Sequence, residues 1–378
     1  MPSAVNRRTP YPVVSVVMSV FNGERFLREA VESILYQSFS DFEFIIVDDG
    51  STDQSYAILD SYKKSDNRIR IHSQENRGSA LSLNQGCHLA NGKYIARMDA
   101  DDIAMKDRLA LQVEFMEANP LVGILGGAAE WIDAAGNPLG VHRHPAEDAQ
   151  IKEAMLHHCA FWHPTVLMRT QVFTWSGGYR PMVFDAEDYD LWLRAAERFQ
   201  LANLSQILIK YRIHPNQVSI QKNRQQTMGI LAARAAAKAR RMGKPDPLIE
   251  SQKITSVTLV ELGIDKVTQE KEFAFRSWLW VRAMYTSGEY SAATRVAVEV
   301  LRSSESYLGS WQLSEWYLIL GKLCWRQNDH AKGLLFMCRA LLARPMLLGR
   351  PLKQWLQRVR PSKTNVIADS PEKLCKSE

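Results

Sequence analysis

Apolar residues change their spacing along the chain in a way that predicts alternating strands and helices. Continuous apolar runs of strand length occur at residues 13–19, 42–47, 69–72 and 94–98, and stretches with helical spacing lie between them. Strands that are apolar at nearly every position are typical of parallel sheets, which are covered on both faces. The order of these elements predicts an open, mostly parallel α/β sheet over about residues 12–222.

Residues 223–360 are predicted to contain only helices, because helical spacing continues there and is interrupted mainly at glycines and prolines. Within this region, residues 285–293 and 325–333 each combine aromatics, a polar turn and small residues. This pattern resembles, weakly, the inner turn of a tetratricopeptide helix pair. The alternative is a helical bundle packed against the α/β domain.

The end of the helical region is strongly basic. Residues 332–360 contain seven lysines and arginines and no acidic residue, interleaved with leucines, a phenylalanine and a tryptophan. A basic amphipathic stretch can lie on an anionic membrane surface, so we expect peripheral membrane contact here. The alternative is a terminal helix whose apolar face joins the core. We expect residues 1–11 to be a flexible N-terminus and residues 361–378 to be a disordered tail.

Composition and charge place the chain among ordinary globular proteins. Hydrophobic residues make up 46% of the 378 residues, charged residues make up 23%, and the formal net charge is +6. This charge suits phosphate-bearing ligands or an anionic membrane but does not identify a function by itself.

The five cysteines are scattered and form no C-x-x-C pair, which argues against a zinc knuckle and a disulfide framework. With no apolar signal core and no run of about 18 apolar residues, we expect a cytoplasmic protein without a transmembrane helix.

Acidic residues gather where two of the predicted strands end. The segments that follow the second and fourth strands are Asp48-Asp49 and Asp99-Ala100-Asp101-Asp102. Ligands of open α/β sheets bind outside the carboxyl ends of the strands, and carboxylates crowded there repel one another unless a cation or hydrogen-bond donors compensate them. Oxygen ligands at this spacing suit Mg²⁺ or Mn²⁺ together with substrate phosphate oxygens. The alternative is that such aspartates cap helices, as Asp53 and Asp102 could do.

The glycine-rich loops that hold phosphates do not follow any of these strands. Neither G-x-G-x-x-G nor G-x-x-x-x-G-K-[ST] is present there, which argues against a dinucleotide dehydrogenase and a P-loop NTPase. A nucleotidyltransferase would usually need a basic, glycine-containing loop near the first strand. Residues 21–24 offer no lysine or arginine for that purpose.

A series of short motifs runs through residues 12–220. In order they are VSVVMSVFNG at 14–23, IVDDGSTD at 46–53, NRG at 76–78, MDADD at 98–102, HP at 163–164, EDYDLWL at 187–193 and YRIH at 211–214. Together they resemble the inverting family 2 glycosyltransferases of bacterial polysaccharide type. The resemblance implies a GT-A fold, with a Rossmann-like and mostly parallel sheet, over residues 12–222.

The resemblance also implies a nucleotide-sugar donor, by analogy a UDP-sugar, and a divalent metal, Mn²⁺ or Mg²⁺, on its diphosphate. The residues implied to border the nucleotide or the sugar are Val20, Asn22, Glu24, Asp49, Arg77, Asp99, His163 and Glu187. Among them, Asp49 would accept a hydrogen bond from the base and Arg77 would lie near the base or the diphosphate. The implied metal ligands are Asp101, as the direct ligand, with Asp99 and His214.

Asp188 is implied to be the catalytic base, because an inverting transfer needs one carboxylate to take the proton of the attacking hydroxyl. The apolar pattern predicts a helix from Asp185 to Arg198. Glu187 and Asp188 would lie in its first turn, where the helix dipole should lower the pKa of both carboxyl groups. The alternative is a charge pair that only marks the start of a helix.

Two basic residues near the last motif have open roles. Lys210 and Arg212 would lie either near the phosphates or on a solvated strand face. His163 is expected to line the sugar pocket and His214 to approach the diphosphate.

The motifs predict transfer of a sugar to a glycan or lipid-linked acceptor in cell-envelope, exopolysaccharide or lipopolysaccharide biosynthesis. The enzyme would be cytoplasmic, in peripheral contact with the inner face of the membrane, and without a nucleic-acid partner. The alternative is a catalytically inactive, transferase-like binding protein whose helical domain recruits partners. Intact Asp99, Asp101 and Asp188 argue against that alternative.

Overall fold

The computed structural model describes residues 11–346, and these residues form two compact units. The described parts of the first unit are residues 11–131, 141–212 and 228–263, and those of the second are residues 132–140, 213–227 and 264–346. The expected domain boundary at residues 222 and 223 stays a prediction. The expected disordered tail, residues 1–10 of the expected flexible N-terminus and the part of the basic stretch beyond residue 346 lie outside the described residues.

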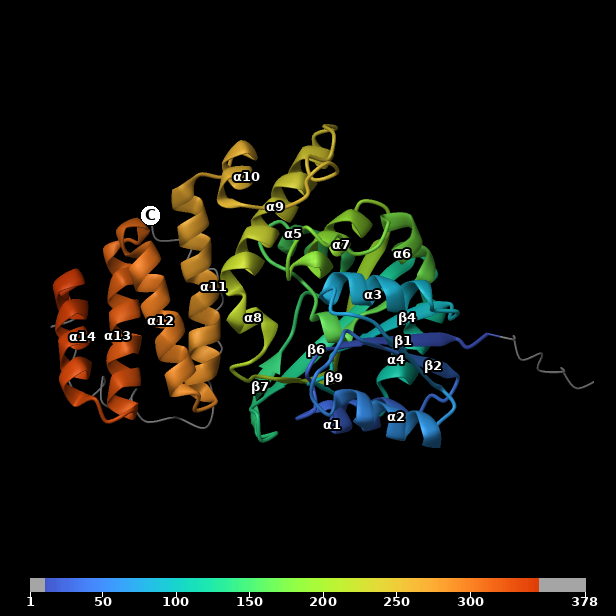
Figure 1. Ribbon diagram of the computed structural model, residues 1–378. Coiled ribbons are helices and arrows are strands. Elements are labelled where there is room, and N and C mark those ends of the chain that lie inside the picture. Colours follow the sequence, from blue (N-terminus) through green and yellow to red (C-terminus); the bar gives the residue numbers. More distant parts are fainter. Residues whose placement is uncertain (1–10, 347–378) are drawn as a thin grey trace, which may run out of the picture. The chain divides into compact units, whose positions relative to one another are not determined.

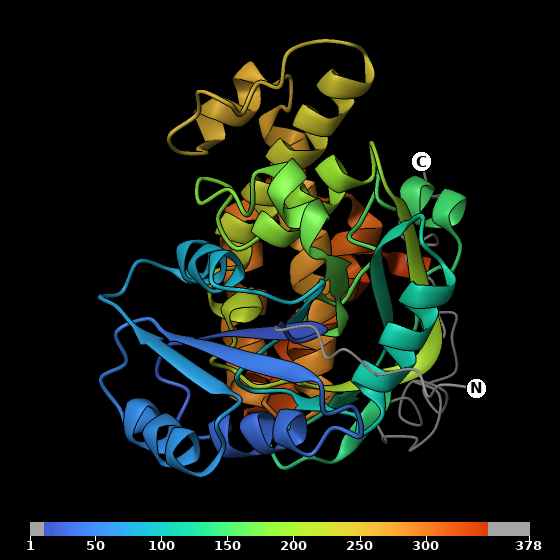
Figure 2. The same ribbon diagram turned by 90° about the vertical axis from the view of Figure 1, so that its right-hand side faces the viewer.

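A nine-stranded sheet dominates the first unit (Figures 1 and 2). Its order is β3-β2-β1-β4-β8-β6-β9-β5, with β7 paired to β6. The strands are β1 Val14–Val20, β2 Phe42–Asp48, β3 Ile69–Ser73, β4 Tyr94–Met98, β5 Ile103–Ala104, β6 Val122–Ile132, β7 Pro138–His142, β8 Leu167–Arg169 and β9 Gln200–Arg212. The first four strands pair in parallel, whereas β8 is antiparallel to β4 and β6, and β5 is antiparallel to β9. The expected α/β sheet is confirmed, and it is mixed.

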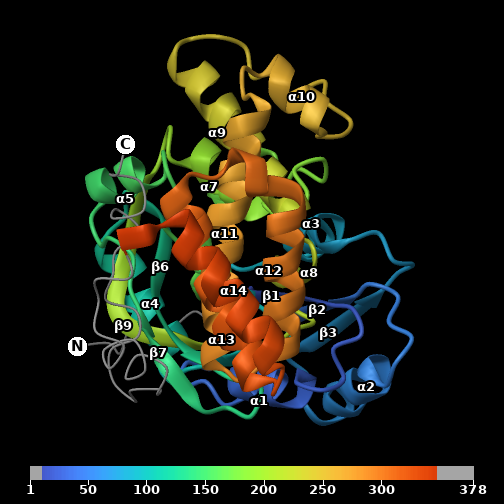
Figure 3. The same cartoon turned by 90° about the vertical axis from the view of Figure 1, so that its left-hand side faces the viewer.

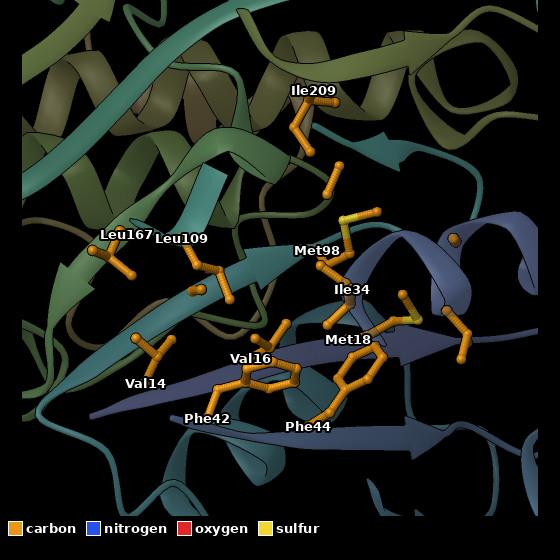
Figure 4. Packing of buried hydrophobic residues seen from close by; sticks show 14 of the residues in the cluster. Val14, Val16, Met18, Ile34, Phe42, Phe44, Met98, Leu109, Leu167 and Ile209 are labelled. Carbon is orange, nitrogen blue, oxygen red and sulfur yellow. The ribbon is translucent and has the colours of Figure 1, made fainter. Parts of the chain in front are cut away.

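Helices cover both faces of the parallel part of this sheet. Those that lie wholly in the first unit are α1 Leu27–Leu35, α2 Ser55–Ser65, α3 Ser79–His88, α4 Arg108–Ala118, α5 Asp148–Ala154, η1 His163–Thr165, α6 Thr170–Ser176, α7 Glu187–Ala195 and α10 Ser256–Glu261. Alternate residues of β1 and β2, such as Val16 and Phe44, pack with Ile34 of α1 and Leu109 of α4 in one buried cluster (Figure 4). On the other face α3 lies against β1 so closely that a Cβ on Gly86 would come within 2.6 Å of the Val17 side chain. Burial on both faces explains why these strands are apolar throughout, and each such side chain contributes about 1.5–3 kcal/mol.

The strand register brings the ends of three strands to one edge of the sheet. Val14 pairs with both Phe42 and Tyr94, and Val20 pairs with Asp48. The loops that follow β1, β2 and β4 therefore begin at nearly the same level. The expected gathering of strand-end residues at one edge is confirmed.

The second unit is mainly helical (Figure 3), which confirms the helical region expected from the sequence. Its helices are α8 Val218–Gln221, α11 Lys266–Thr286, α12 Tyr290–Ser304, η2 Glu305–Tyr307, α13 Ser310–Arg326 and α14 His330–Ala343. Helix α9, Asn223–Arg241, belongs to this unit up to Thr227 and to the first unit from Met228. No helix in residues 11–346 is long and apolar enough to span a membrane.

Consecutive long helices of the second unit pack against each other, and two of the connecting turns are alike. Gly288 and Asn328 both have a positive φ, of 84° and 62°. In each turn the next backbone N–H donates to a carbonyl five residues earlier, from Glu289 to Met284 at 2.8 Å and from Asp329 to Cys324 at 2.9 Å. The turns are helix ends of the same type, closed by a left-handed residue. The tetratricopeptide resemblance itself stays a prediction.

Candidate active site

The loops that follow β1 and β2 hold each other through bonds between side chains and backbone. Asn22 Oδ1 accepts from the N–H of Thr52 at 2.8 Å, and Glu24 Oε2 accepts from the N–H of Gln54 at 2.9 Å. Asp53 in turn accepts from the N–H of Glu24 at 3.1 Å. Asp53 Oδ1 also accepts from the N–H of Ser55, the first residue of α2, at 2.9 Å, so its side chain caps this helix from one position before Gln54. Asn22 and Glu24 are exposed at the edge of the sheet, and their contact with a nucleotide base stays a prediction.

Asp49 organises the loop that follows β3. Its carboxylate accepts from the side-chain amide of Gln74 at 2.8 Å and from the backbone N–H groups of Arg77 at 2.9 Å and Gly78 at 2.8 Å. Its own N–H donates to the carbonyl of Val20 at 2.8 Å. The Val20 side chain is 1% exposed and lies in the core, so only its backbone borders the edge. Asp49 therefore has a structural task besides its expected contact with the base.

Arg77 and Gly50 complete this side of the site. The Arg77 side chain is exposed, and its guanidinium pairs with no carboxylate of the described residues, so a permanent positive charge is available at the edge. Gly50 has a φ of 76°, and a Cβ there would come within 2.8 Å of the backbone nitrogen of Asn76. Glycine is required at this position because both the backbone conformation and the close approach exclude a side chain.

Three carboxylates lie together after β4. Burial and the charge of Asp101 raise the pKa of Asp99, although Arg97 lies 2.5 Å from it. Burial and the charges of Asp101 and Asp99 raise the pKa of Asp102 well above its usual range. Asp102 does not cap a helix: its Oδ1 accepts from the N–H of Arg212 at 2.8 Å. The negative charge of the cluster is therefore only partly compensated by protein groups.

The donor set of this cluster fits a divalent cation. Asp102 Oδ2 is buried and has no hydrogen-bond partner among the described residues. The two pKa values are raised first by burial and then by repulsion between the carboxylates, and a cation would relieve both. Carboxylate oxygens are ligands that Mg²⁺ and Mn²⁺ prefer. Within residues 11–346 no three His, Cys, Asp or Glu side chains are arranged to hold a metal ion by themselves. Ligands from a substrate would therefore have to complete the coordination.

Two arginines support the cluster, in a role that the sequence motifs did not predict. Arg212 is 2% exposed, and it donates from Nε to the carbonyl of Asp101 at 2.9 Å and from Nη2 to Glu29 at 2.8 Å. It is therefore not a solvated strand residue, and its position near the phosphates stays a prediction. Arg97 lies within β4 and is 5% exposed. An arginine inside an otherwise apolar strand was a signal that could have identified it.

Glu187 and Asp188 begin helix α7. Burial raises the pKa of Glu187 to about 8 and that of Asp188 to about 6, and the Asp99 charge adds to the rise for Asp188. The expectation that the helix dipole would lower both values is wrong, because the loss of hydration outweighs the dipole here. Glu187 is consequently protonated at neutral pH, whereas most Asp188 carboxylates are charged. The Asp188 side chain remains 23% exposed.

His163 lies beside Asp188. The distance from His163 Nδ1 to Asp188 Oδ2 is 3.9 Å, and His163 Nε2 lies 3.1 Å from the hydroxyl of Tyr179. Burial and the charge of Arg97 hold the pKa of His163 well below its usual range, so the ring is neutral. Arg97 also interacts with Asp99, Glu187 and Asp188. The structure therefore brings Asp99, Glu187, Asp188 and His163 together around one buried arginine.

His214 belongs to the second unit, unlike the residues above. It is 8% exposed, and its backbone N–H donates to the side-chain oxygen of Gln217 at 3.0 Å. Its role as a metal ligand stays a prediction.

Taken together, the first unit offers an edge for a phosphate-bearing ligand, a carboxylate cluster for a cation, and a separate carboxylate whose pKa of about 6 suits a base at neutral pH.

A family model described as "Glycosyl transferase family 2" matches residues 15–173. An uncharacterized glycosyltransferase of Haemophilus influenzae is 34% identical over 57% of this chain and 70% of that protein. The O-antigen biosynthesis glycosyltransferase WbnJ of Escherichia coli is 33% identical over 53% of this chain and 80% of that protein.

Among solved structures, S. aureus TarS 1–349 in complex with UDP superposes with a TM-score of 0.49, at 16% identity, over 89% of this chain and 92% of that chain. The mixed sheet with helices on both faces is the GT-A arrangement that the sequence motifs predicted. The chain belongs to glycosyl transferase family 2.

Proposed function

We propose that the chain transfers a sugar from a nucleotide-diphosphate donor to a hydroxyl of a glycan or lipid-linked acceptor, with inversion at the anomeric carbon. The observation that carries the proposal is that Asp188 lies close enough to Asp99 for the charge of one to raise the pKa of the other. Inverting transfer needs one base on the acceptor side and a stabilised leaving group on the donor side. The two carboxylates would supply these two tasks from positions around Arg97.

In this proposal Asp188 accepts the proton of the attacking hydroxyl. Its carboxylate is partly exposed, so an acceptor can reach it, and its pKa of about 6 makes it a stronger base than an ordinary aspartate. Neutral His163 and protonated Glu187 surround the sugar with hydrogen-bonding groups that carry no charge. No second carboxylic acid is required, because a diphosphate leaves without being protonated first.

On the donor side, Asp101 and Asp99 would hold a divalent metal, Mn²⁺ or Mg²⁺. When bound, the metal supplies Lewis-acid stabilisation of the leaving diphosphate. The nucleotide lies against the backbone of Val20 and against Asn22, Glu24 and Asp49, with the exposed Arg77 near the phosphates. A UDP-sugar is the proposed donor.

The pathway is proposed to be cell-envelope, exopolysaccharide or lipopolysaccharide assembly, because the relative WbnJ is described as an enzyme of O-antigen biosynthesis. The end of the helical unit supports a location on the inner face of the membrane. Helix α14 exposes Leu334, Leu335 and Leu342 next to the basic Lys332 and Arg339. Flotation with phosphatidylglycerol vesicles tests this part, since a chain truncated after residue 331 should stay with the soluble fraction.

The proposed function is tested with two variants that separate base from metal site. Asp188→Asn should still be stabilised by UDP with Mn²⁺ in a thermal-shift assay, while transfer from the best UDP-sugar falls by about 10²–10⁴-fold. Asp101→Ala should lose the Mn²⁺-dependent stabilisation. Asp60→Asn, which alters a surface carboxylate of α2 paired with Lys64, is the matched control. Full transfer activity in Asp188→Asn would exclude Asp188 as the base.

A further inference from the structure

Five aromatic and imidazole rings pack together in the first unit, from β6, β7, β9 and two adjoining loops. They are Trp131, His142, His144, Trp162 and Tyr211, which we call the aromatic–histidine cluster. Trp131 and His142 stack with centroids 4.0 Å apart, and Trp162 lies 4.9 Å from His144 and 5.6 Å from Tyr211. Trp131 is buried, whereas the other four rings are partly exposed. The cluster is therefore a surface lined by rings and not a closed part of the core.

Three ring nitrogens of this cluster are buried and have no hydrogen-bond partner among the described residues. They are Nε2 of His142, Nε2 of His144 and Nε1 of Trp162. Buried polar groups normally have a partner in the protein, in ordered water or in a ligand. For these three atoms the partner would have to be ordered water or a polar group of another molecule.

The chemistry of these nitrogens favours hydroxyl groups. Burial lowers the pKa of His142 to about 4 and that of His144 to about 3, so both rings are neutral at physiological pH and offer no positive charge to an anion. A neutral imidazole nitrogen either donates or accepts a hydrogen bond, and a hydroxyl can do both. No three side chains of the metal-binding types are arranged as a metal site anywhere in the described part of the chain.

Two residues of the cluster adjoin residues of the candidate active site along the chain. Trp162 directly precedes His163, whose Nδ1 lies 3.9 Å from Asp188. Tyr211 directly precedes Arg212, whose N–H and guanidinium hold the loop of Asp101. The backbone segments that carry Trp162 and Tyr211 therefore continue directly into residues that contact the proposed base and the carboxylate loop.

We propose that the aromatic–histidine cluster is a subsite for a sugar ring of the acceptor, held by stacking on Trp162 and Tyr211 and by hydroxyl contacts to His142 and His144. This inference rests on the proposed function, because it assigns the acceptor of that same site. A pyranose presents an apolar C–H face and a rim of hydroxyls, and aromatic walls with a few polar groups are the surroundings that bind such a ligand. The acceptor class is accordingly a glycan whose terminal sugar enters the site.

The experiment measures binding of methyl glycosides of glucose, galactose, mannose and N-acetylglucosamine to the full chain by saturation-transfer NMR. At least one glycoside should show saturation transfer from the wild type. His142→Phe combined with His144→Phe keeps the rings and removes the nitrogens, and should weaken that binding by about tenfold. Trp162→Leu removes the stacking surface and should abolish it. Trp175→Phe, on an exposed tryptophan that packs with Phe199, is the matched control and should bind like the wild type.

Stabilisation by UDP with Mn²⁺ should be the same in the wild type and in every variant, which shows that each variant is folded on the donor side. Glycoside binding without UDP stabilisation would reject the proposed donor while the sugar subsite stands. The subsite is overturned if no glycoside binds the wild type, or if the variants bind glycosides as the wild type does. A lower melting temperature with unchanged glycoside binding would likewise overturn it, because the cluster would then serve only for packing.

Discussion

Transfer activity should fall as the pH drops through about 6, because Asp188 takes up a proton there and a protonated base cannot accept another. Burial raises the pKa of Asp188 from 3.8 to about 6. Holding the charged form therefore costs about 3 kcal/mol relative to an ordinary aspartate. With a pKa of about 6, roughly nine in ten Asp188 carboxylates are charged at pH 7 and roughly one in ten at pH 5. The expected decrease in kcat/KM between these pH values is about tenfold.

The assay is kcat/KM for the donor, measured below saturation from pH 4.5 to 8 with Mn²⁺ and acceptor held constant. Under these conditions the profile reports groups of the free enzyme. Glu187→Gln provides the control, because burial raises the pKa of Glu187 to about 8 and the residue is already uncharged at neutral pH. This variant should keep the acidic limb near pH 6. Thermal-shift curves at each pH separate loss of activity from unfolding.

A profile that stays flat from pH 7 to pH 5 would refute the reasoning. An unburied aspartate would still be largely charged at pH 5, so a flat profile would mean either that Asp188 is not desolvated or that another group is the base. A limb near pH 8 that disappears in Glu187→Gln would transfer the role to Glu187.

Three further predictions concern the residues that hold the site together. Asp49→Ala leaves two backbone N–H groups and a side-chain amide without their acceptor. The free energy of unfolding, measured by urea titration, should therefore fall by about 2–3 kcal/mol. An unchanged midpoint of the urea titration would contradict this prediction. Gly50→Ala forces a side chain into a positive φ against the backbone of Asn76, should cost about 1–3 kcal/mol, and is checked by the same titration. Arg212→Met keeps much of the side-chain volume but removes the bond to the Asp101 carbonyl, so it should weaken Mn²⁺-dependent stabilisation by UDP more than it lowers the melting temperature without ligand.

Much of the fold follows from local patterns. The apolar runs that became β1, β2 and β4 are long enough for a strand and too short for a helix, and both faces of each strand are buried in the structure. Burial on both faces is what removes polar positions from such strands. The helical second half could also be predicted from the sequence, because apolar residues keep helical spacing on either side of the turns at Gly288 and Asn328.

Only part of the candidate site could be predicted from the sequence. Strand-end aspartates could be located because loops after parallel strands meet at one edge. The role of Asp102 as a helix cap was wrong, since its nearest hydrogen-bond donor in space is not near it in sequence. Asp102 instead bonds Arg212, which lies 110 residues later.

The sequence by itself determined the alternation of strands and helices, the acidic ends of two strands and the family to which the chain belongs. Each of these depends on residues close together in the chain or on motifs in a fixed order. Only the tertiary structure decided that Arg97 lies among Asp99, Asp188 and His163, and that burial raises the pKa of Asp188 instead of the helix dipole lowering it. The physical reason is that hydration and charge depend on every neighbour in space, and most neighbours of these groups are distant in sequence.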